Sequence, residues 1–563
     1  MLFTILFILL SVLCLVFGIN NYGFSLLRIF FQNVNWDYYS PTPPRNLAFY
    51  FSFVFSYLAF HSYRFEYLKK KSILKIFVNL FLQIKLFFLK RIKNYKPSLS
   101  FHTLALTFIV LLGFFIRAYK LPFVILYDEA ATYLDYCDGG FTSLLKIWNT
   151  NNHLINTLLM KISIEAFGND VIALRLPSLL FGFANILLIY YISMQLYGKL
   201  TALISTFIYS CTPVLIHFES LARGYSFKVT FTLLLFIACF HFLQKPSKVY
   251  LFVISFISSL GFLTIFSFLF PFLGFLLWII YELNNKSFEK KIIFYYTFLI
   301  VLYTKIISIV FYTPSIILSN GIYNILKTSR SGNMNVYGSF PEDIPSFFID
   351  FSDMVFFNNA LLAIIVFCFS WYIISKGNKL TSLILSQFVC AVVVMIALKA
   401  IFPPRVFIYI VPFIILLTSE LISKVFLSLN GPQYLILPSL QLLIYLYFIE
   451  NKVVNNYHGF VNDGIKEVVE ELKRLPSPSS RDTKILLKAH SGYYKSFKYY
   501  MRINDLPTIE IYNDGQNSKN VDVINHSFYI ICSKHDVIKN KNFTKVFDTK
   551  MFEIYKSKIF QQS

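Results

Sequence analysis

Residues 173–196 read ALRLPSLLFGFANILLIYYISMQL, and this stretch decides the fold class. It is long and apolar enough for an α-helix that crosses a lipid bilayer, which needs about 20 mostly apolar residues. Similar stretches recur along the chain and give about thirteen candidate spans. They lie at residues 2–18, 47–62, 101–119, 173–196, 199–216, 225–243, 249–265, 267–282, 292–312, 355–374, 381–400, 405–422 and 433–449. The sequence therefore predicts a polytopic all-α membrane protein.

The composition supports this class. Of 563 residues, 56% are hydrophobic and only 14% are charged, which is too little charge to cover the surface of a soluble domain. The 65 Phe and 38 Tyr suit both the hydrocarbon core of a bilayer and its interfaces. The net charge of +22 comes from Lys and Arg in short segments between apolar stretches, and no nucleic-acid motif accompanies it. Nucleic acid is therefore not an expected partner, whereas the lipid bilayer is.

The charge of the connections orients the spans. Basic connections at residues 64–96, 244–248, 284–291 and 375–379 all fall on one side, which the positive-inside rule makes cytoplasmic. The opposite side receives residues 121–171, a hinge at 219–225, a loop at 313–353 and the tail after residue 450. The polar segments that contain the candidate catalytic and binding residues are thus expected on the extracytoplasmic face.

Three domains are expected. Residues 1–97 form an N-terminal extension with two spans and a basic helix at 69–96, which reads either as a simple anchor or as a lipid or partner contact. Residues 98–452 form the transmembrane domain with its outer loop at 120–172. Residues 453–563 form a small extracytoplasmic α/β domain, suited to acceptor contact or to structural capping. Its expected elements are a helix at 465–475, strands at 484–489, 508–512 and 528–532, and a hairpin at 546–555.

Charged side chains next to membrane spans are the candidates for chemistry, since they are costly in an apolar protein. Asp128 and Glu129 follow the third span, and His153, Arg223 and Arg405 reach the same face by this topology. A carboxylate can accept the proton of an attacking hydroxyl, and arginines can bind a phosphate leaving group. The simpler alternatives are a solvated carboxylate, snorkelling arginines and a structural histidine.

Four motifs carry a family resemblance. They read YDEAATY at residues 127–133, NHLINTLL at 152–159 with ALRLPS at 173–178, LARGYS at 221–226, and PRVF at 404–407. In order and spacing they resemble the GT-C glycosyltransferases, within which they are most similar to the protein O-mannosyltransferase and aminoarabinose lipid A transferase group. The resemblance covers residues 101–285 and extends more weakly to about residue 450. Many relatives carry His-Pro-Pro where this chain has His153-Leu154-Ile155.

The resemblance implies an inverting glycosyltransferase that moves a hexose or pentose from a polyprenyl-phosphate donor to a lipid, glycan or protein acceptor. It implies the bacterial inner membrane, with the active site on the outer face. Asp128 would be the catalytic base, and Glu129 would position the acceptor or a cation. The residues implied in donor or lipid-phosphate binding are Asn152, His153, Arg223, Tyr225 and Arg405.

No organic cofactor is expected, and metal use is left open between a divalent cation and none. The seven cysteines are scattered, without CxxC or Cys/His spacing, and support neither a zinc site nor a disulfide framework. Two other classes remain. A lipid-linked sugar flippase would also need many spans, although transporters place charges near the bilayer midplane. A non-catalytic scaffold would bind through its outer tail.

Overall fold

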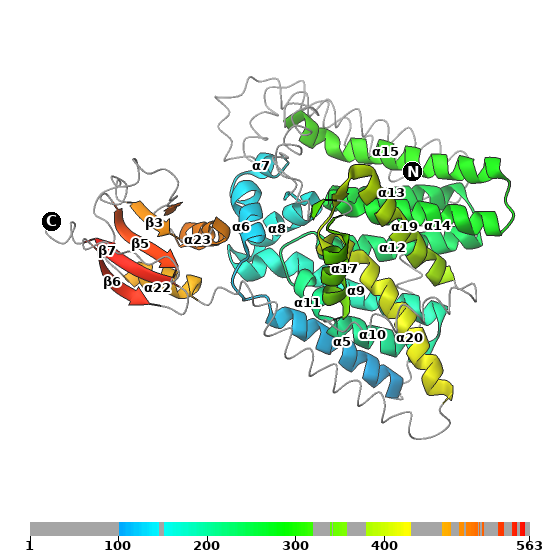
Figure 1. The fold of residues 1–563 in the computed structure, drawn as a ribbon, viewed down its shortest axis with the longest axis horizontal. Helices are drawn as coiled ribbons and strands as arrows, with labels where there is room; N and C mark the ends of the chain where they lie inside the picture. The colour runs from blue at the N-terminus through cyan, green and yellow to red at the C-terminus, as the bar shows by residue number, and fades with distance from the viewer. Residues whose placement is uncertain are drawn as a thin grey trace.

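A computed structural model describes most of the transmembrane domain and parts of the C-terminal domain. Helices fill one end of the molecule's long axis, and a small sheet lies at the other end (Figure 1). The predicted spans at 2–18, 47–62 and 433–449 and the basic helix at 69–96 lie outside the described residues. The described residues are 101–145, 151–318, 338–339, 342–356, 379–428, 464–474, 484–488, 491–504, 506, 509–511, 527–533, 543–548 and 552–557.

The polytopic all-α class is confirmed. Within the described ranges, seven helices are long and apolar enough to cross a membrane, or eight if a bent pair counts as one span. The count of thirteen stays a prediction. A shorter apolar helix, α13 (Lys248–Thr264), accompanies these spans. The seven are α5 (Phe101–Tyr119), α9 (Val171–Leu196), α12 (Tyr225–Gln244), η3 with α14 (Phe266–Phe268, Leu269–Asn285), α15 (Lys290–Leu318), α19 (Lys379–Leu398) and η4 with α20 (Pro404–Ile410, Val411–Ser428).

The bent pair replaces the single span expected at residues 199–216. Helix α10 (Lys199–Cys211) and helix α11 (Pro213–Glu219) meet at an angle of 62°. The break follows from Pro213, which has no N–H to donate and forces Thr212 into an extended conformation. The bend matters because α11 ends at Glu219, the first residue of the predicted hinge.

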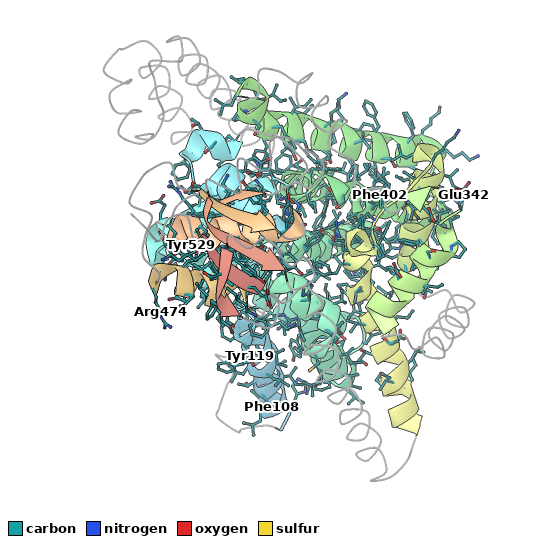
Figure 2. All side chains as sticks on the ribbon, turned by 60° about the vertical axis from the view of Figure 1, so that its left-hand side comes forward. Phe108, Tyr119, Glu342, Phe402, Arg474 and Tyr529 are labelled. Atoms are coloured by element: carbon teal, nitrogen blue, oxygen red, sulfur yellow. The ribbon has the colours of Figure 1, made fainter. Side chains whose placement is uncertain are left out.

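The apolar side chains divide between a packed core and a lipid-facing surface. Phe236 of α12, Trp278 of α14 and Phe413 of α20 pack together in the core. Phe108 and Tyr119 lie along α5 at the edge of the molecule (Figure 2) and are 65% and 71% exposed. A soluble protein would bury such residues, whereas a bilayer accommodates them.

Short elements form the loop between α5 and α9. They are α6 (Tyr127–Thr132), the π-helix η2 (Tyr133–Cys137), α7 (Phe141–Leu145) and α8 (Leu154–Phe167). Further along the chain, α17 (Ile344–Phe356) contains the first two residues of the span expected at 355–374, and the remainder of that span lies outside the described residues. Strand β1 (Gly338–Ser339) pairs antiparallel with β2 (Ala400–Ile401), just before η4.

The C-terminal domain contains a five-stranded sheet in the order β4-β3-β5-β7-β6. Strand β3 runs parallel to β4 and β5, and β7 runs antiparallel to β5 and β6. The expected helix, strands and hairpin are all present, but helix α23 was not expected. The elements are α22 (Ile465–Arg474), β3 (Lys484–Lys488), α23 (Ser491–Ile503), β4 (Ile509–Ile511), β5 (Ser527–Ser533), β6 (Phe543–Asp548) and β7 (Phe552–Ser557).

Candidate functional site

The candidate base Asp128 lies in the first turn of α6, with its side chain 49% exposed. Its Oδ2 is 3.5 Å from Nη2 of Arg223, which comes from the hinge after α11 and is almost fully buried. Asn151 joins the two residues: its amide nitrogen donates to the carbonyl of Asp128 at 3.0 Å, and its side-chain oxygen accepts from Arg223 Nη1. The structure therefore brings the predicted base and one predicted phosphate ligand together.

Glu129, the next residue, points into the protein and is fully buried. Both of its carboxylate oxygens accept from Arg175 of α9, at 2.8 Å from Nε and 2.6 Å from Nη2. The same oxygens also accept from the backbone N–H groups of Leu126 at 2.9 Å and Ala222 at 2.6 Å. The carboxylate thus has four protein donors and joins α6, α9 and the hinge.

In the structure the hinge is the connection between α11 and α12, residues 220–224, and hydrogen bonds to its backbone hold it in place. Ala222 N–H donates to Glu129, and Gly224 N–H donates to Nδ1 of His153 at 2.8 Å. The carbonyl of Ala222 accepts from Asn156 of α8 at 3.1 Å. These bonds lie on both sides of Arg223 in the sequence, so they fix the backbone from which its side chain extends toward Asn151 and Asp128.

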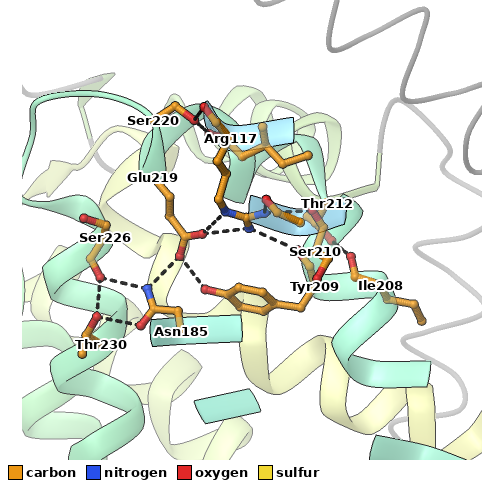
Figure 3. Close-up of polar contacts among 12 residues, drawn as sticks. Arg117, Asn185, Ile208, Tyr209, Ser210, Thr212, Glu219, Ser220, Ser226 and Thr230 are labelled. Atoms are coloured by element: carbon orange, nitrogen blue, oxygen red, sulfur yellow. Dashed lines mark hydrogen bonds and ion pairs between the residues drawn. The ribbon is translucent and has the colours of Figure 1, made fainter. Parts of the chain in front are cut away.

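A second buried ion pair fixes the start of the hinge (Figure 3). Glu219 at the end of α11 pairs with Arg117 of α5 at 2.8 Å, and both side chains are 0% exposed. Its other oxygen accepts from Asn185 of α9 at 2.7 Å and from Tyr209 of α10 at 2.5 Å. Arg117 also donates to the carbonyls of Gly113 and Ser210. A charge pair in apolar surroundings is stable only with such full hydrogen bonding.

His153, which accepts a hydrogen bond from the hinge, is a neutral imidazole. Burial, reinforced by the positive charges of Arg223 and Lys228, holds the pKa of His153 well below its usual value of 6.5. Because Nδ1 accepts from Gly224, the neutral ring carries its proton on Nε2. Tyr225 packs edge-on against the ring at 6.0 Å, so these two predicted residues lie together. The neighbouring Asn152 is buried and donates to the carbonyl of Leu144.

Arg405 lies half-buried in η4, and its guanidinium makes no hydrogen bond or ion pair with the residues that the structure describes. Its element is fastened to α12 by Lys228, whose ammonium donates to the carbonyl of Val406 at 2.6 Å and to Ser267 at 2.9 Å. The ammonium also lies over the ring of Tyr409. Lys228 therefore couples the Arg405 segment to the helix that begins directly after the hinge.

Sequence reasoning missed several residues of this site. Arg117, Arg175 and Lys228 each carry a single charge inside an apolar stretch, and that cost was the signal that could have revealed them. Asn151 stands next to the predicted Asn152 and His153 in the sequence, but it was given no role, because an asparagine in a polar loop is common.

The residues around Asp128 do not resemble a divalent-cation site. Among the residues that the structure describes, no group of three His, Cys, Asp or Glu side chains could hold a metal ion. The neighbouring carboxylate of Glu129 is engaged with Arg175, and a guanidinium rather than a second carboxylate faces Asp128. Magnesium and calcium are bound mainly by carboxylate, carbonyl and water oxygens, so we derive no step through a metal.

Comparison with known families finds one matching model, described as dolichyl-phosphate-mannose-protein mannosyltransferase, over residues 154–312. Among solved structures, the chain is similar to ArnT from Cupriavidus metallidurans, in the apo state and bound to undecaprenyl phosphate. Each shows a TM-score of 0.55 and 12% identity, covering 80% of this chain and 97% of that chain. An oligosaccharyltransferase from Archaeoglobus fulgidus, in complex with Zn and sulfate, has a TM-score of 0.45 and 11% identity, covering 76% of this chain and 68% of that one. No curated protein matches significantly.

These findings confirm the predicted resemblance. The chain has the fold of the GT-C glycosyltransferases, and part of its sequence matches a mannosyltransferase family of that class. The matched segment begins at Leu154, the first residue of α8, and ends within α15. It therefore includes the hinge with Arg223, whereas Asp128 lies before it and Arg405 after it.

Proposed function

We propose that this chain is a membrane glycosyltransferase. It moves a sugar from a polyprenyl-phosphate-linked donor to an acceptor on the extracytoplasmic face, with inversion at the anomeric carbon. The fold supports the class of enzyme, and the ArnT structure with bound undecaprenyl phosphate supports a polyprenyl-phosphate partner. One observation carries the mechanism: the half-exposed carboxylate of Asp128 lies beside the buried guanidinium of Arg223.

In the proposed reaction the acceptor hydroxyl attacks the anomeric carbon of the donor sugar, from the face opposite the phosphate. The new C–O bond forms while the bond from that carbon to the phosphate oxygen breaks. The hydroxyl proton passes to Asp128, and the bonding electrons leave with the polyprenyl phosphate. A single displacement inverts the configuration. The phosphate is a good leaving group, so the mechanism needs no second carboxylate as an acid.

Arg223 binds the donor phosphate and stabilises the charge that develops on it. Its Nε is buried and has no acceptor among the described residues, which supports a role toward a bound anion. Arg405, half-buried and without an ion-pair partner in the part of the chain described, is the second phosphate ligand. Tyr225 and Asn152 complete the proposed donor-binding site.

Glu129 and His153 act through their neighbours. Glu129 orients α6 and the hinge together, because its oxygens accept from Arg175 and from the backbone of Ala222. His153 holds Gly224 and presents Nε2–H, which can donate but cannot serve as a base. The proton of the acceptor therefore goes to Asp128.

The bacterial inner membrane is the proposed location, with the Asp128 face turned outward. The decisive experiment compares surface glycoconjugates by mass spectrometry with and without the gene, and with a gene carrying Asp128→Asn. Loss of one sugar both without the gene and with the Asp128→Asn gene supports the proposal and identifies the acceptor. Loss of a whole polymer, with its lipid precursor retained inside, would instead identify a flippase. Unchanged glycoconjugates, together with no transfer by purified protein, would rule out the activity.

A further inference from the structure

Helix α23 of the C-terminal domain packs directly against the loop that carries Asp128. The hydroxyl of Tyr500 accepts from the backbone N–H of Ile125 at 3.1 Å, three residues before Asp128. The ring of Tyr499 meets that of Tyr133 edge-on at 4.9 Å. The two elements lie side by side in Figure 1, where α23 is the part of the C-terminal domain nearest to α6.

Charged contacts extend this interface on both sides of Asp128. Lys495 pairs with Asp135 at 2.7 Å, and Arg502 pairs with Asp138 at 3.1 Å. Before Asp128, Lys466 of α22 donates to the carbonyl of Pro122 at 2.6 Å. The acidic residues come from the loop and the basic residues from the C-terminal domain, so the two surfaces are complementary in charge.

The interface also has an apolar core. One continuous buried cluster joins Ile125, Ala130 and Tyr133 of the loop with residues of the C-terminal domain, among them Val468 and Phe497. Ala130 and Ile125 are completely buried, although they are close to Asp128 in the sequence. A loop that places a catalytic carboxylate needs support of this kind, since loops are otherwise the most mobile part of a fold.

We propose that the C-terminal domain is a positioning element of the active site, in which Tyr500, Lys495 and Arg502 hold residues 122–138 so that the Asp128 carboxylate faces Arg223. This inference rests on the proposed sugar transfer. By this proposal the C-terminal domain contributes to the rate of turnover, which neither structural capping nor acceptor binding alone would require. Among these contacts, the hydrogen bond between Tyr500 and Ile125 is the simplest to test, because a single hydroxyl holds a single backbone N–H group.

The first test uses Tyr500→Phe and Lys495→Gln in the full-length protein, purified into nanodiscs. The turnover number is expected to fall by about three- to tenfold in each variant, since each loses one hydrogen bond or one half-buried pair. The apparent KM values for donor and acceptor should stay within about twofold, because neither residue contacts substrate. Lys498→Gln on the same helix is the matched control, since Lys498 contacts Tyr494 and makes no ion pair with the described loop residues.

The second test restores the contact. The charge exchange Asp135→Lys with Lys495→Asp should recover most of the turnover that either single reversal loses. Hydrogen exchange followed by mass spectrometry provides a readout that does not depend on activity. Exchange in residues 122–138 should rise in Tyr500→Phe, while that of the sheet strands stays unchanged.

The outcomes separate the two proposals. If the wild type transfers no sugar, the proposed function fails, whatever the exchange data show. If the wild type transfers sugar but Tyr500→Phe and Lys495→Gln match it in turnover and exchange, the positioning role fails. A raised KM for the acceptor at unchanged turnover would also overturn it, because the domain would then bind the acceptor.

Discussion

Two adjacent carboxylates have opposite surroundings. Asp128 is half-exposed beside Arg223, whereas Glu129 is completely buried against Arg175. Consecutive residues of a helix point in different directions, so one can face the site while the other faces the core. Sequence analysis could predict that this pair is important. It could not divide the roles, because the partner of Glu129 lies 46 residues further along the chain.

The role of Asp128 gives the first prediction. Asp128→Asn keeps the shape of the side chain but cannot accept a proton, so the transfer rate should fall by about a hundred- to ten-thousandfold, the usual contribution of a general base. The thermal unfolding midpoint should not change, because the side chain makes only a long contact with Arg223. Glu165→Gln is the control, since that carboxylate is exposed on α8. Transfer at the wild-type rate in Asp128→Asn would contradict the assignment of the base.

His153 gives a prediction about pH. Burial keeps this histidine neutral in the folded protein, whereas the unfolded chain takes up a proton below about pH 6.5. Its contribution to stability is therefore complete above pH 6.5 and is lost as the pH falls, by up to about 1.4 kcal/mol per pH unit. His153→Asn places an amide oxygen where Nδ1 accepts from Gly224 and does not titrate. Unfolding midpoints at pH 7.5 and 5.5 should differ less in this variant than in the wild type, and an equal difference would refute the assignment.

At the scale of elements, the hinge depends on two close approaches. A Cβ atom on Gly182 would lie 2.9 Å from the Cβ of Glu219, and one on Gly224 would lie 3.0 Å from Nδ1 of His153. Glycine at 182 lets α9 reach the end of α11, and a side chain at 224 would have to displace His153 by a few tenths of an ångström. Gly182 and Gly224 therefore contribute to the site through the space they leave, whereas its other residues contribute charges and hydrogen bonds.

The buried pair of Arg117 and Glu219 gives the prediction for this scale. Glu219→Ala leaves the Arg117 charge buried without its partner, which should reduce the free energy of unfolding by about 3–5 kcal/mol. Adding Arg117→Met should recover a large part of that loss, because it removes the unpaired charge. Chemical denaturation of the purified protein measures both. Glu165→Gln breaks an i,i+4 pair on α8 whose carboxylate is exposed, and it should change stability by less than about 1 kcal/mol. A double variant no more stable than the single one would refute the pairing argument.

The spans and strands could be predicted, whereas the contacts between them could not. Apolar stretches of the required length gave α9, α12 and α14, and alternating residues gave β3 and β5. Pro213 in the sequence could have predicted the bend between α10 and α11. Helix α23 was missed because its tyrosines and lysines read as a polar segment, although Tyr499 and Tyr500 are buried. Their burial depends on the loop near Asp128, more than 360 residues away in the chain.

At the scale of the whole molecule, the contact between α23 and the loop has a consequence for topology. A folded domain that packs on residues 122–138 must lie on the same side of the membrane as Asp128. The charge of the connections predicts that both segments lie on the extracytoplasmic side, although the loop follows the third expected span and the C-terminal domain follows the thirteenth. The described structure thus requires the two segments to share a side, and the sequence predicts which side it is.

Cysteine labelling in intact cells tests on which side of the membrane the C-terminal domain and Asp128 lie. Glu470→Cys on α22 is exposed in the C-terminal domain and should react with a membrane-impermeant maleimide. Lys245→Cys, exposed in the basic turn between α12 and α13, should react only after the membrane is permeabilised. The unmodified protein gives the background, which should be low for Cys137, Cys211 and Cys239 because they are buried. The opposite labelling pattern would place Asp128 in the cytoplasm, where a donor carried by the outer leaflet could not reach it.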